Sequence, residues 1–279
     1  MTVHDDGRER WALVLGASSG FGGATAQGWA RAGFHILGVH LDLRGTIAAA
    51  EEVRERIAAT GVEVVFHNVN AADDEKRAGV VASIGELFAA RRAAGHEPYI
   101  AAFLHSLAFG ATLPYIATDE GAKELSRKQM EMTADVMAHS MLYWVRDLFH
   151  AGLLGHGSRL YAMTSEGATL AVPTYGAVSA AKAALEAHVR QLALELMPHG
   201  ITVNAIRAGV TDTPALHRIP NWEHLLAESE RRNPGNRATR PEDVADALVA
   251  LASPLTHWMT GNVIGVDGGE VMGQRDPGK

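Results

Sequence analysis

Short aliphatic runs alternate along the chain with longer alanine-rich stretches in which apolar residues recur at helical spacing. The short runs predict strands at 11–16, 34–41, 62–67, 99–105, 158–165, 201–207 and 262–267. The longer stretches predict helices at 21–32, 46–60, 73–94, 120–150, 174–197 and 241–252. Strands that are apolar at nearly every position are typical of a parallel sheet covered on both faces. The pattern therefore predicts an α/β fold with a doubly wound parallel sheet of about seven strands and helices on both faces.

No linker, low-complexity tract or internal repeat divides this pattern, so we expect one domain over residues 1–279. The exception to the regular alternation is 208–240, a polar stretch that is too long for an ordinary connection. It is predicted to be a mobile loop with one or two short helices. Its length and its prolines suggest that the part near 211–235 becomes ordered over a substrate.

Composition excludes several classes of function. A net charge of -7 argues against nucleic acid or an anionic membrane as a partner. The absence of cysteine removes disulfides, thiolate metal sites and thiol catalysis, and the 14 histidines show no H-E-x-x-H spacing, so no metal site is predicted. No apolar run is long enough to span a membrane and no signal peptide is evident, which predicts a cytoplasmic protein.

A glycine-rich loop follows the first predicted strand and opens the first predicted helix. Its sequence GASSGFG contains Gly16, Gly20 and Gly22. Glycine is suited to this place because the backbone must turn sharply and approach a pyrophosphate, which the helix N-terminus then binds. We predict a Rossmann-type dinucleotide site that includes the loop residues Gly16, Ser18, Ser19, Gly20, Phe21 and Gly22.

The other strand ends supply further candidates for cofactor binding. After the second strand, Asp42 would bond the ribose 2'-hydroxyl of NAD, whereas Arg44 would favour the 2'-phosphate of NADP, so the choice between NAD and NADP stays open. Thr213 is a candidate for the carboxamide or pyrophosphate, and equally a helix N-cap before Pro214. The complete set beyond the glycine loop is His40, Asp42, Arg44, Asn68, Val69, His105, Ser106, Lys182, Gly209, Thr211 and Thr213.

A tyrosine and a lysine seven residues apart, Tyr175 and Lys182, stand after the fifth strand. At helical spacing both would lie on one face of a helix. An ammonium near the phenol would favour the phenolate and make the tyrosine a better proton donor, and the same lysine could hold a ribose hydroxyl. A solvated helix face is the ordinary explanation of such a pair, but its position downstream of a nucleotide loop favours catalysis.

The chain resembles the short-chain dehydrogenase/reductases, and within them the bacterial enoyl-acyl carrier protein reductases. The features that carry the resemblance are the glycine loop, the Tyr175/Lys182 pair, the Asn204 to Gly209 run with Thr213, and the VDGG sequence at 266–269. Three departures from ketone-reducing members point to enoyl reduction: Val178 four residues before Lys182, the His105 to Gly110 run after strand four, and Met137 in place of a helix asparagine. The stretch 211–244 further resembles the substrate loop of the type III, NADPH-using enoyl reductases.

The resemblance implies a reaction in which hydride from NADH or NADPH reaches C3 of an enoyl thioester. Charge then develops on the thioester oxygen, so the stabilising hydroxyl must be displaced from its place in ketone reduction, and Tyr175 lies about one helical turn (about 5 Å) upstream of that place. Tyr175 would bond the enolate oxygen, Lys182 would hold the nicotinamide ribose, and Thr164 takes the position of the family's active-site serine. The implied substrate is an acyl thioester on acyl carrier protein or coenzyme A, and the implied assembly is a homotetramer or homodimer.

Neighbouring residues leave further questions open. Ser165 occupies the position of the second tyrosine of type I enoyl reductases, and Glu166 is interpreted as a solvated loop acid. Four methionines of the 120–150 helix could line an acyl pocket but are more often core: Met130, Met132, Met137 and Met141. An acidic carrier protein would need a local basic patch such as Arg231, Arg232, Arg237 and Arg240.

Three functions therefore remain: an enoyl thioester reductase, a ketone or alcohol dehydrogenase of the same fold, and a non-catalytic nucleotide sensor. Retention of both Tyr175 and Lys182 makes the sensor the weakest of the three.

Overall fold

Seven parallel strands form one sheet in the order β3-β2-β1-β4-β5-β6-β7 in the computed structural model, which describes residues 7–118 and 121–272. The strands are β1 (Glu9–Leu15), β2 (His35–His40), β3 (Val64–Asn68), β4 (Pro98–His105), β5 (Arg159–Thr164), β6 (Thr202–Ala208) and β7 (Val263–Val266). Each lies within two residues of its predicted bounds. The predicted fold class is confirmed.

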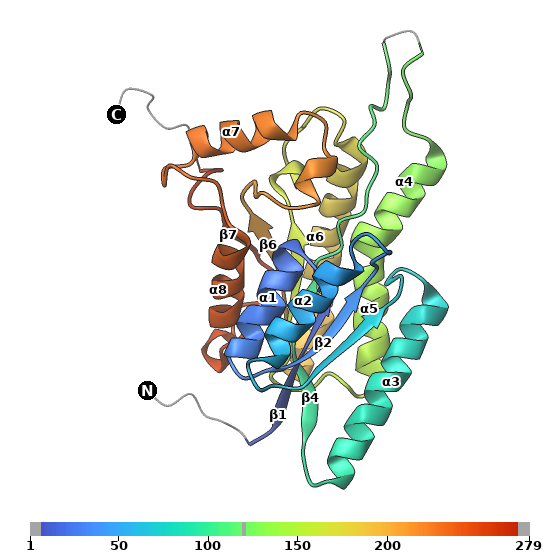
Figure 1. Ribbon diagram of the computed structural model, residues 1–279, viewed down its shortest axis with the longest axis vertical. Coiled ribbons are helices and arrows are strands. Elements are labelled where there is room, and N and C mark those ends of the chain that lie inside the picture. The colour runs from blue at the N-terminus through green and yellow to red at the C-terminus, as the bar shows by residue number, and fades with distance from the viewer. Residues whose placement is uncertain (1–6, 119–120, 273–279) are drawn as a thin grey trace.

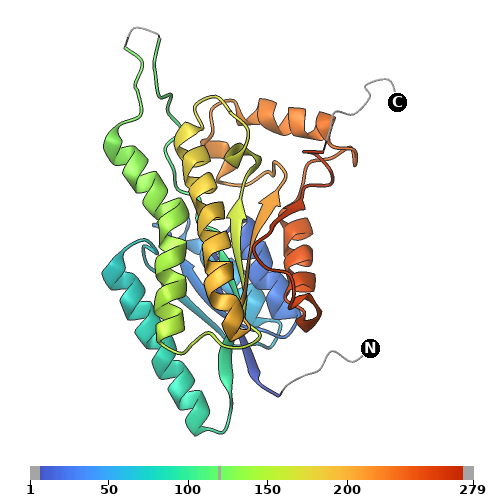
Figure 2. The same ribbon diagram turned by 180° about the vertical axis from the view of Figure 1, so that it is seen from behind.

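Helices cover both faces of this sheet. They are α1 (Gly20–Arg31), α2 (Ile47–Ala58), α3 (Asp74–Ala93), α4 (Arg127–Ala134), α5 (Ser140–His150), α6 (Gly176–Leu196), α7 (Trp222–Arg232) and α8 (Pro241–Leu251). One layer contains α1, α2 and α8 (Figure 1), and the opposite layer contains α3, α4, α5 and α6 (Figure 2). None of the helices in the described parts of the chain is both long and apolar enough to cross a membrane.

Strand β1 shows why the central strands are apolar throughout. Trp11, Leu13 and Leu15 pack into the core on one side of the sheet, and Ala12 and Val14 pack into the core on the other. All five side chains are fully buried. Side chains alternate across a strand, so a helical layer on each face requires an apolar residue at every position.

The helix expected at 120–150 differs from the prediction. Residue 120 lies outside the described residues, and α4 begins only at Arg127, after the N-cap Ser126. The side chains of Ser126 and Gln129 form a capping box, which satisfies the first free amides and starts the helix there. A π-helical segment, Asp135–His139, separates α4 from α5.

All seven strands point the same way, so their carboxyl ends share one edge of the sheet. The chain order reverses between β1 and β4, and such a switch point opens a crevice for a ligand at that edge. Helix α7 lies above the carboxyl ends of the strands in Figure 1. The 208–240 stretch contains α7 and a 3-10 turn at Leu216–Arg218, so the prediction of one or two short helices is confirmed.

Candidate active site

The glycine loop between β1 and α1 is shaped by close backbone contacts. Gly16 has a φ of 88°, and a Cβ added there would lie 2.6 Å from the carbonyl oxygen of Ser106. A Cβ on Gly22 would lie 2.1 Å from the Gly16 carbonyl oxygen. Ser19, the N-cap of α1, makes no side-chain cap bond, so the first amides of the helix stay available for an anion. These features fit a pyrophosphate.

Threonines after β6 lie close to this loop. A Cβ on Gly20 would be 3.5 Å from Cγ2 of Thr213, so the structure brings Thr213 to the loop. Its Oγ1 also accepts a bond from the Leu216 amide at 3.3 Å, as an N-cap would. Thr211 donates its hydroxyl to the Gly209 carbonyl at 2.9 Å and is buried.

Asp42 is fixed at the end of β2, where the ribose is expected. His40 Nδ1 lies 2.8 Å from its Oδ2, and the side chain of Asn68 bonds both its amide and its carbonyl at 2.9 Å. Burial alone would raise the pKa of Asp42, but bonds from Thr46, Ser18 and His40 outweigh it and lower the pKa. Ser18 belongs to the glycine loop, whereas Arg44 is exposed. A charged acceptor, not a guanidinium, is therefore held at this corner.

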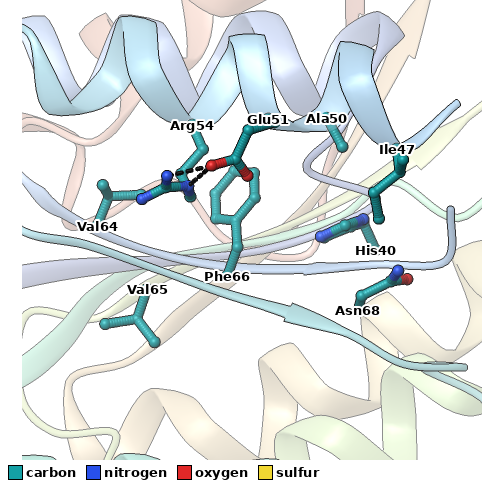
Figure 3. Close-up of a pocket in the computed structure, with 9 residues that line it drawn as sticks. All are labelled: His40, Ile47, Ala50, Glu51, Arg54, Val64, Val65, Phe66 and Asn68. Carbon is teal, nitrogen blue, oxygen red and sulfur yellow. Dashed lines mark hydrogen bonds and ion pairs between the residues drawn. The ribbon is translucent and has the colours of Figure 1, made fainter.

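An open cavity of about 490 Å³ lies beside this corner, between α2 and β3 (Figure 3). His40 and Asn68 border the cavity. Arg54 and Glu51, both on α2, form an ion pair on its helical side. Phe66 is among its apolar lining residues. Sequence reasoning missed Glu51, Arg54 and Phe66, since nothing in their local spacing distinguishes them from an ordinary helix and strand.

At the end of β4, the predicted residues His105 and Ser106 make different contacts. Ser106 donates its amide to the Leu15 carbonyl at 2.9 Å and borders the glycine loop. His105 is fully buried, and its Nε2 lies 2.8 Å from Oγ of Ser140. The Ser140 hydroxyl donates its hydrogen bond to the Val136 carbonyl at 2.8 Å. Its oxygen therefore accepts from His105 Nε2–H. The side chain of His105 is thus bonded to Ser140, the residue after the π-helical segment, and not to the glycine loop.

Burial keeps His105 neutral. It lowers the pKa of His105 to about 3, and the nearby charge of Lys182 acts in the same direction. Its Nδ1 has no hydrogen-bond partner among the described residues.

Tyr175 stands at the N-cap of α6, one residue before the helix begins, and not within the helix as predicted. Its ring is close to the turn after β5, because a Cβ on Gly167 would lie 2.8 Å from its Cε1. Burial raises the pKa of Tyr175, a bond from Ser165 opposes that rise, and the charge of Glu166 adds to it.

Lys182 lies in the interior of α6 and is buried. Its Nζ donates to the Met163 carbonyl at 2.7 Å, and burial lowers the pKa of Lys182 to about 8 against the opposing charge of Glu186. Thr164 donates its hydroxyl to Glu186 Oε1 at 2.7 Å.

Lys182 is bonded to β5, and the groups that shift the pKa of Tyr175, besides burial, are Ser165 and Glu166. The effect of Lys182 on the phenol stays a prediction.

Val178, four residues before Lys182, is part of the core. A Cβ on Gly110 would lie 2.8 Å from both Cγ2 of Val178 and Sδ of Met137. Met137 and Met141 are buried core residues, which agrees with the ordinary interpretation, and Met130 and Met132 are partly buried. The side chain four residues before Lys182 therefore offers no hydrogen-bond donor.

A second phenol, which sequence reasoning missed, lies beside Tyr175. A Cβ on Gly176 would lie 2.6 Å from Cζ of Tyr115, so the ring of Tyr115 covers the start of α6. The segments after β4 and β5 also carry exposed apolar side chains, Phe109, Ile116 and Leu170. An apolar ligand portion would find contact area here.

One interpretation of a charged residue is wrong. Glu166 is not a solvated loop acid: its side chain is 17% exposed and pairs with Arg232 at 3.2 Å. Of the arginines that an acidic carrier protein would need, three are paired with carboxylates: Arg231 with Glu228, Arg232 with Glu166 and Glu270, and Arg237 with Asp243. Within residues 7–118 and 121–272, no three His, Asp or Glu side chains gather in a way that could hold a metal.

Comparison with known proteins gives the family. The family model described as enoyl-(acyl carrier protein) reductase matches residues 16–270. The chain belongs to this family. It is 30% identical over 218 residues to the NADH-dependent enoyl-[acyl-carrier-protein] reductase FabI of Escherichia coli, with 78% of each chain covered.

Solved structures place the fold among both enoyl and keto reductases. The enoyl-[acyl-carrier-protein] reductase (NADH) of Aquifex aeolicus superposes with a TM-score of 0.80 at 25% identity, covering 96% of this chain and 99% of that one. The reductase LugOII, described as promiscuous and as catalysing keto-reduction, gives the same TM-score, identity and coverage. The chain is thus an oxidoreductase of the short-chain dehydrogenase/reductase superfamily.

Proposed function

We propose that this protein reduces the C2–C3 double bond of an enoyl thioester with NADH or NADPH. The observation that carries the proposal is the place of the phenol. Tyr175 stands at the N-cap of α6, and the position one turn before Lys182 is filled by the buried Val178. This position supports a hydroxyl that meets a thioester oxygen, and not a carbonyl that receives hydride.

The chain's residues divide the work as follows. The nicotinamide cofactor supplies the hydride when it is bound. Tyr175 donates a hydrogen bond to the developing enolate oxygen, and burial makes this bond stronger than it would be in water. Lys182 holds the ribose with the N–H groups that Met163 leaves free, since an ammonium has three donors. Thr164 bonds Glu186, which lies one turn after Lys182, and so supports that part of α6.

For the cofactor, we propose NADH over NADPH. The carboxylate of Asp42 is held in its charged form by three donors, so it would accept from a ribose 2'-hydroxyl and repel a 2'-phosphate. The E. coli and Aquifex relatives carry NADH in their names. The similarity of the 211–244 stretch to NADPH-using enzymes points the other way, and cofactor titration decides between them.

The substrate side is formed by apolar side chains and by the loop. We propose that an acyl thioester, on acyl carrier protein or coenzyme A, enters beside Tyr115 and that the segment 211–235 becomes ordered over it. Hydrogen exchange in α7 should slow when cofactor and a crotonyl thioester are both present. Exchange that ignores both ligands would exclude this role.

Assays with crotonyl and acetoacetyl thioesters, each with NADH and with NADPH, test the main proposal. Oxidation of cofactor with the crotonyl compound supports it, and oxidation only with the acetoacetyl compound replaces it with keto-reduction, the activity named for LugOII. A non-catalytic sensor would bind cofactor and oxidise it with neither.

We also propose that a second copy of the chain covers the outer edge of the sheet. Strand β7 is an edge strand, and Val263 in it is exposed. Leu255, Trp258 and Met259 just before it are exposed as well, Trp258 by 79%. An open strand edge beside large apolar side chains is typical of an interface, and pairing across it would give a homodimer or, with a second interface, a homotetramer.

A further inference from the structure

Three consecutive residues after β5 surround the ring of Tyr175. Ser165 lowers the pKa of the phenol, the charge of Glu166 raises it, and Gly167 lies against the ring. The state of this phenol is therefore set by one short turn. Of these three residues, only Glu166 carries a charge that another residue could compensate.

Arg232, at the end of α7, supplies that compensation. Its Nη2 lies 3.2 Å from Oε1 of Glu166 and 2.7 Å from Oε1 of Glu270. The Nε of Arg232 and the Oε2 of Glu166 are buried without a hydrogen-bond partner among the described residues. The arginine therefore depends on these two carboxylates, and Glu166 depends on the arginine.

Glu270 anchors the arginine to the fold. Its side chain is fully buried and accepts a bond from the Val210 amide at 3.2 Å. Burial raises the pKa of Glu270, nearby Ser229 of α7 opposes this rise, and the charges of Glu166 and Arg232 act in opposite directions. Arg232 is the last residue of α7, so this ion pair joins the end of the helix to Glu270 when the helix is seated.

We propose that Arg232 is a positioning residue: when α7 is seated over the site, Arg232 compensates the charge of Glu166 and so prepares Tyr175 to donate its hydrogen bond. This inference rests on the proposed role of Tyr175. It makes closure of the loop and activation of the phenol one event, because the residue that closes the loop also neutralises the carboxylate beside the phenol.

The charged groups around Tyr175 allow this coupling to be isolated. Glu166 faces it from the turn after β5, and Lys182 of α6 is bonded to the Met163 carbonyl. From α7, Arg232 is also near Glu228, which pairs with the neighbouring Arg231. Arg231 is exposed, lies on the same helix and carries the same charge, so Arg231→Gln is a matched control for Arg232→Gln.

The test follows the titration of Tyr175 itself. The chain has 5 tyrosines, so labelling with fluorotyrosine gives few fluorine NMR signals, and the one missing in Tyr175→Phe belongs to residue 175. Arg232→Gln should move the titration midpoint of this signal up, Glu166→Gln should move it down, and the double variant should follow Glu166→Gln. Arg231→Gln should leave it in place.

Activity provides the second readout. With the preferred thioester, Arg232→Gln should lower kcat roughly three- to tenfold, and adding Glu166→Gln should restore most of it. Shifts of the same sign in Arg232→Gln and Glu166→Gln, or no shift in either, would overturn the proposal. If Arg232→Gln fails to fold because Glu270 loses its partner, Glu166→Gln keeps that pair and must still lower the midpoint.

The NMR titration needs no substrate. Opposite shifts in a protein that reduces no enoyl thioester would keep the coupling and reject the proposed reaction. Enoyl reduction without the shifts would keep the proposed reaction and reject the coupling.

Discussion

The pH dependence of activity should be set by Lys182. Burial lowers the pKa of this ammonium to about 8. In the role proposed for Lys182, its charge holds the ribose of the cofactor. With that midpoint, about 90% of the groups are charged at pH 7 and about 10% at pH 9. Below the midpoint the cation is present and above it the cation is lost, so kcat/KM for the cofactor should fall about tenfold between pH 7 and pH 9.

Two neighbouring groups of the site are shifted away from this window. The pKa of Tyr175 is raised above its ordinary value and that of His105 is lowered to about 3. A descending limb centred near pH 8 therefore reports on Lys182. The assay is cofactor oxidation at subsaturating NADH, with NADH binding followed in parallel by nicotinamide fluorescence. Activity and binding that stay flat to pH 9.5 would refute the reasoning.

Substitution of Glu186 should shift the pH dependence in a defined direction. The Glu186 carboxylate raises the pKa of Lys182 against burial, so Glu186→Gln should move the limb to lower pH. Glutamine keeps an oxygen that can accept the Thr164 hydroxyl, so the change removes charge and little else. Glu195→Gln, an exposed change on the same helix, should leave the limb in place. Equal behaviour of the two variants would contradict the assignment.

Four further substitutions test the catalytic pair, the ribose corner and the strand edge. Tyr175→Phe should lower kcat by about two to three orders of magnitude and leave the Kd for NADH nearly intact, whereas Lys182→Met should weaken both; equal, small effects in steady-state and binding assays would count against these roles. Asp42→Ala should raise KM for NADH about tenfold and leave that for NADPH unchanged or lower, and a matching loss with both cofactors would remove Asp42 from the ribose site. Trp258→Glu should reduce the molar mass measured by light scattering to that of a monomer, and an unchanged mass would place the interface elsewhere.

The fold was predictable because its signals are local. The alternation of Trp11 to Leu15 between two cores requires five consecutive apolar residues, and that run is visible in the sequence. The start of α4 was also encoded locally, by Ser126 and Gln129, but the alanines and methionines around them masked the cap. The predicted start of this helix was too early, because a capping box determines a helix end more strongly than apolar periodicity does.

The candidate site was predictable in part. The glycine loop is identifiable because Gly16 and Gly22 leave no room for a Cβ, and the strand order brings Thr213 to it. The pairing of Arg232 with Glu166 and Glu270 joins residues 66 and 38 positions apart, and no local pattern announces such a contact. Glu166 was therefore interpreted as solvated, when its partner comes from a helix formed much later in the chain.

The spacing of Tyr175 and Lys182 shows the limit of a motif most clearly. The seven-residue spacing predicts both side chains on one helix, and the structure has Lys182 within α6 and Tyr175 at its N-cap. The electrostatic effect of one on the other depends on where the ammonium is bonded, and the carbonyl of Met163 on β5 decides that. Spacing thus identifies the groups, whereas their acidity is set by a strand carbonyl, a turn carboxylate and an arginine from the loop. A variant that keeps Y-x6-K intact but changes Glu166 should for this reason alter the reaction more than the motif would suggest.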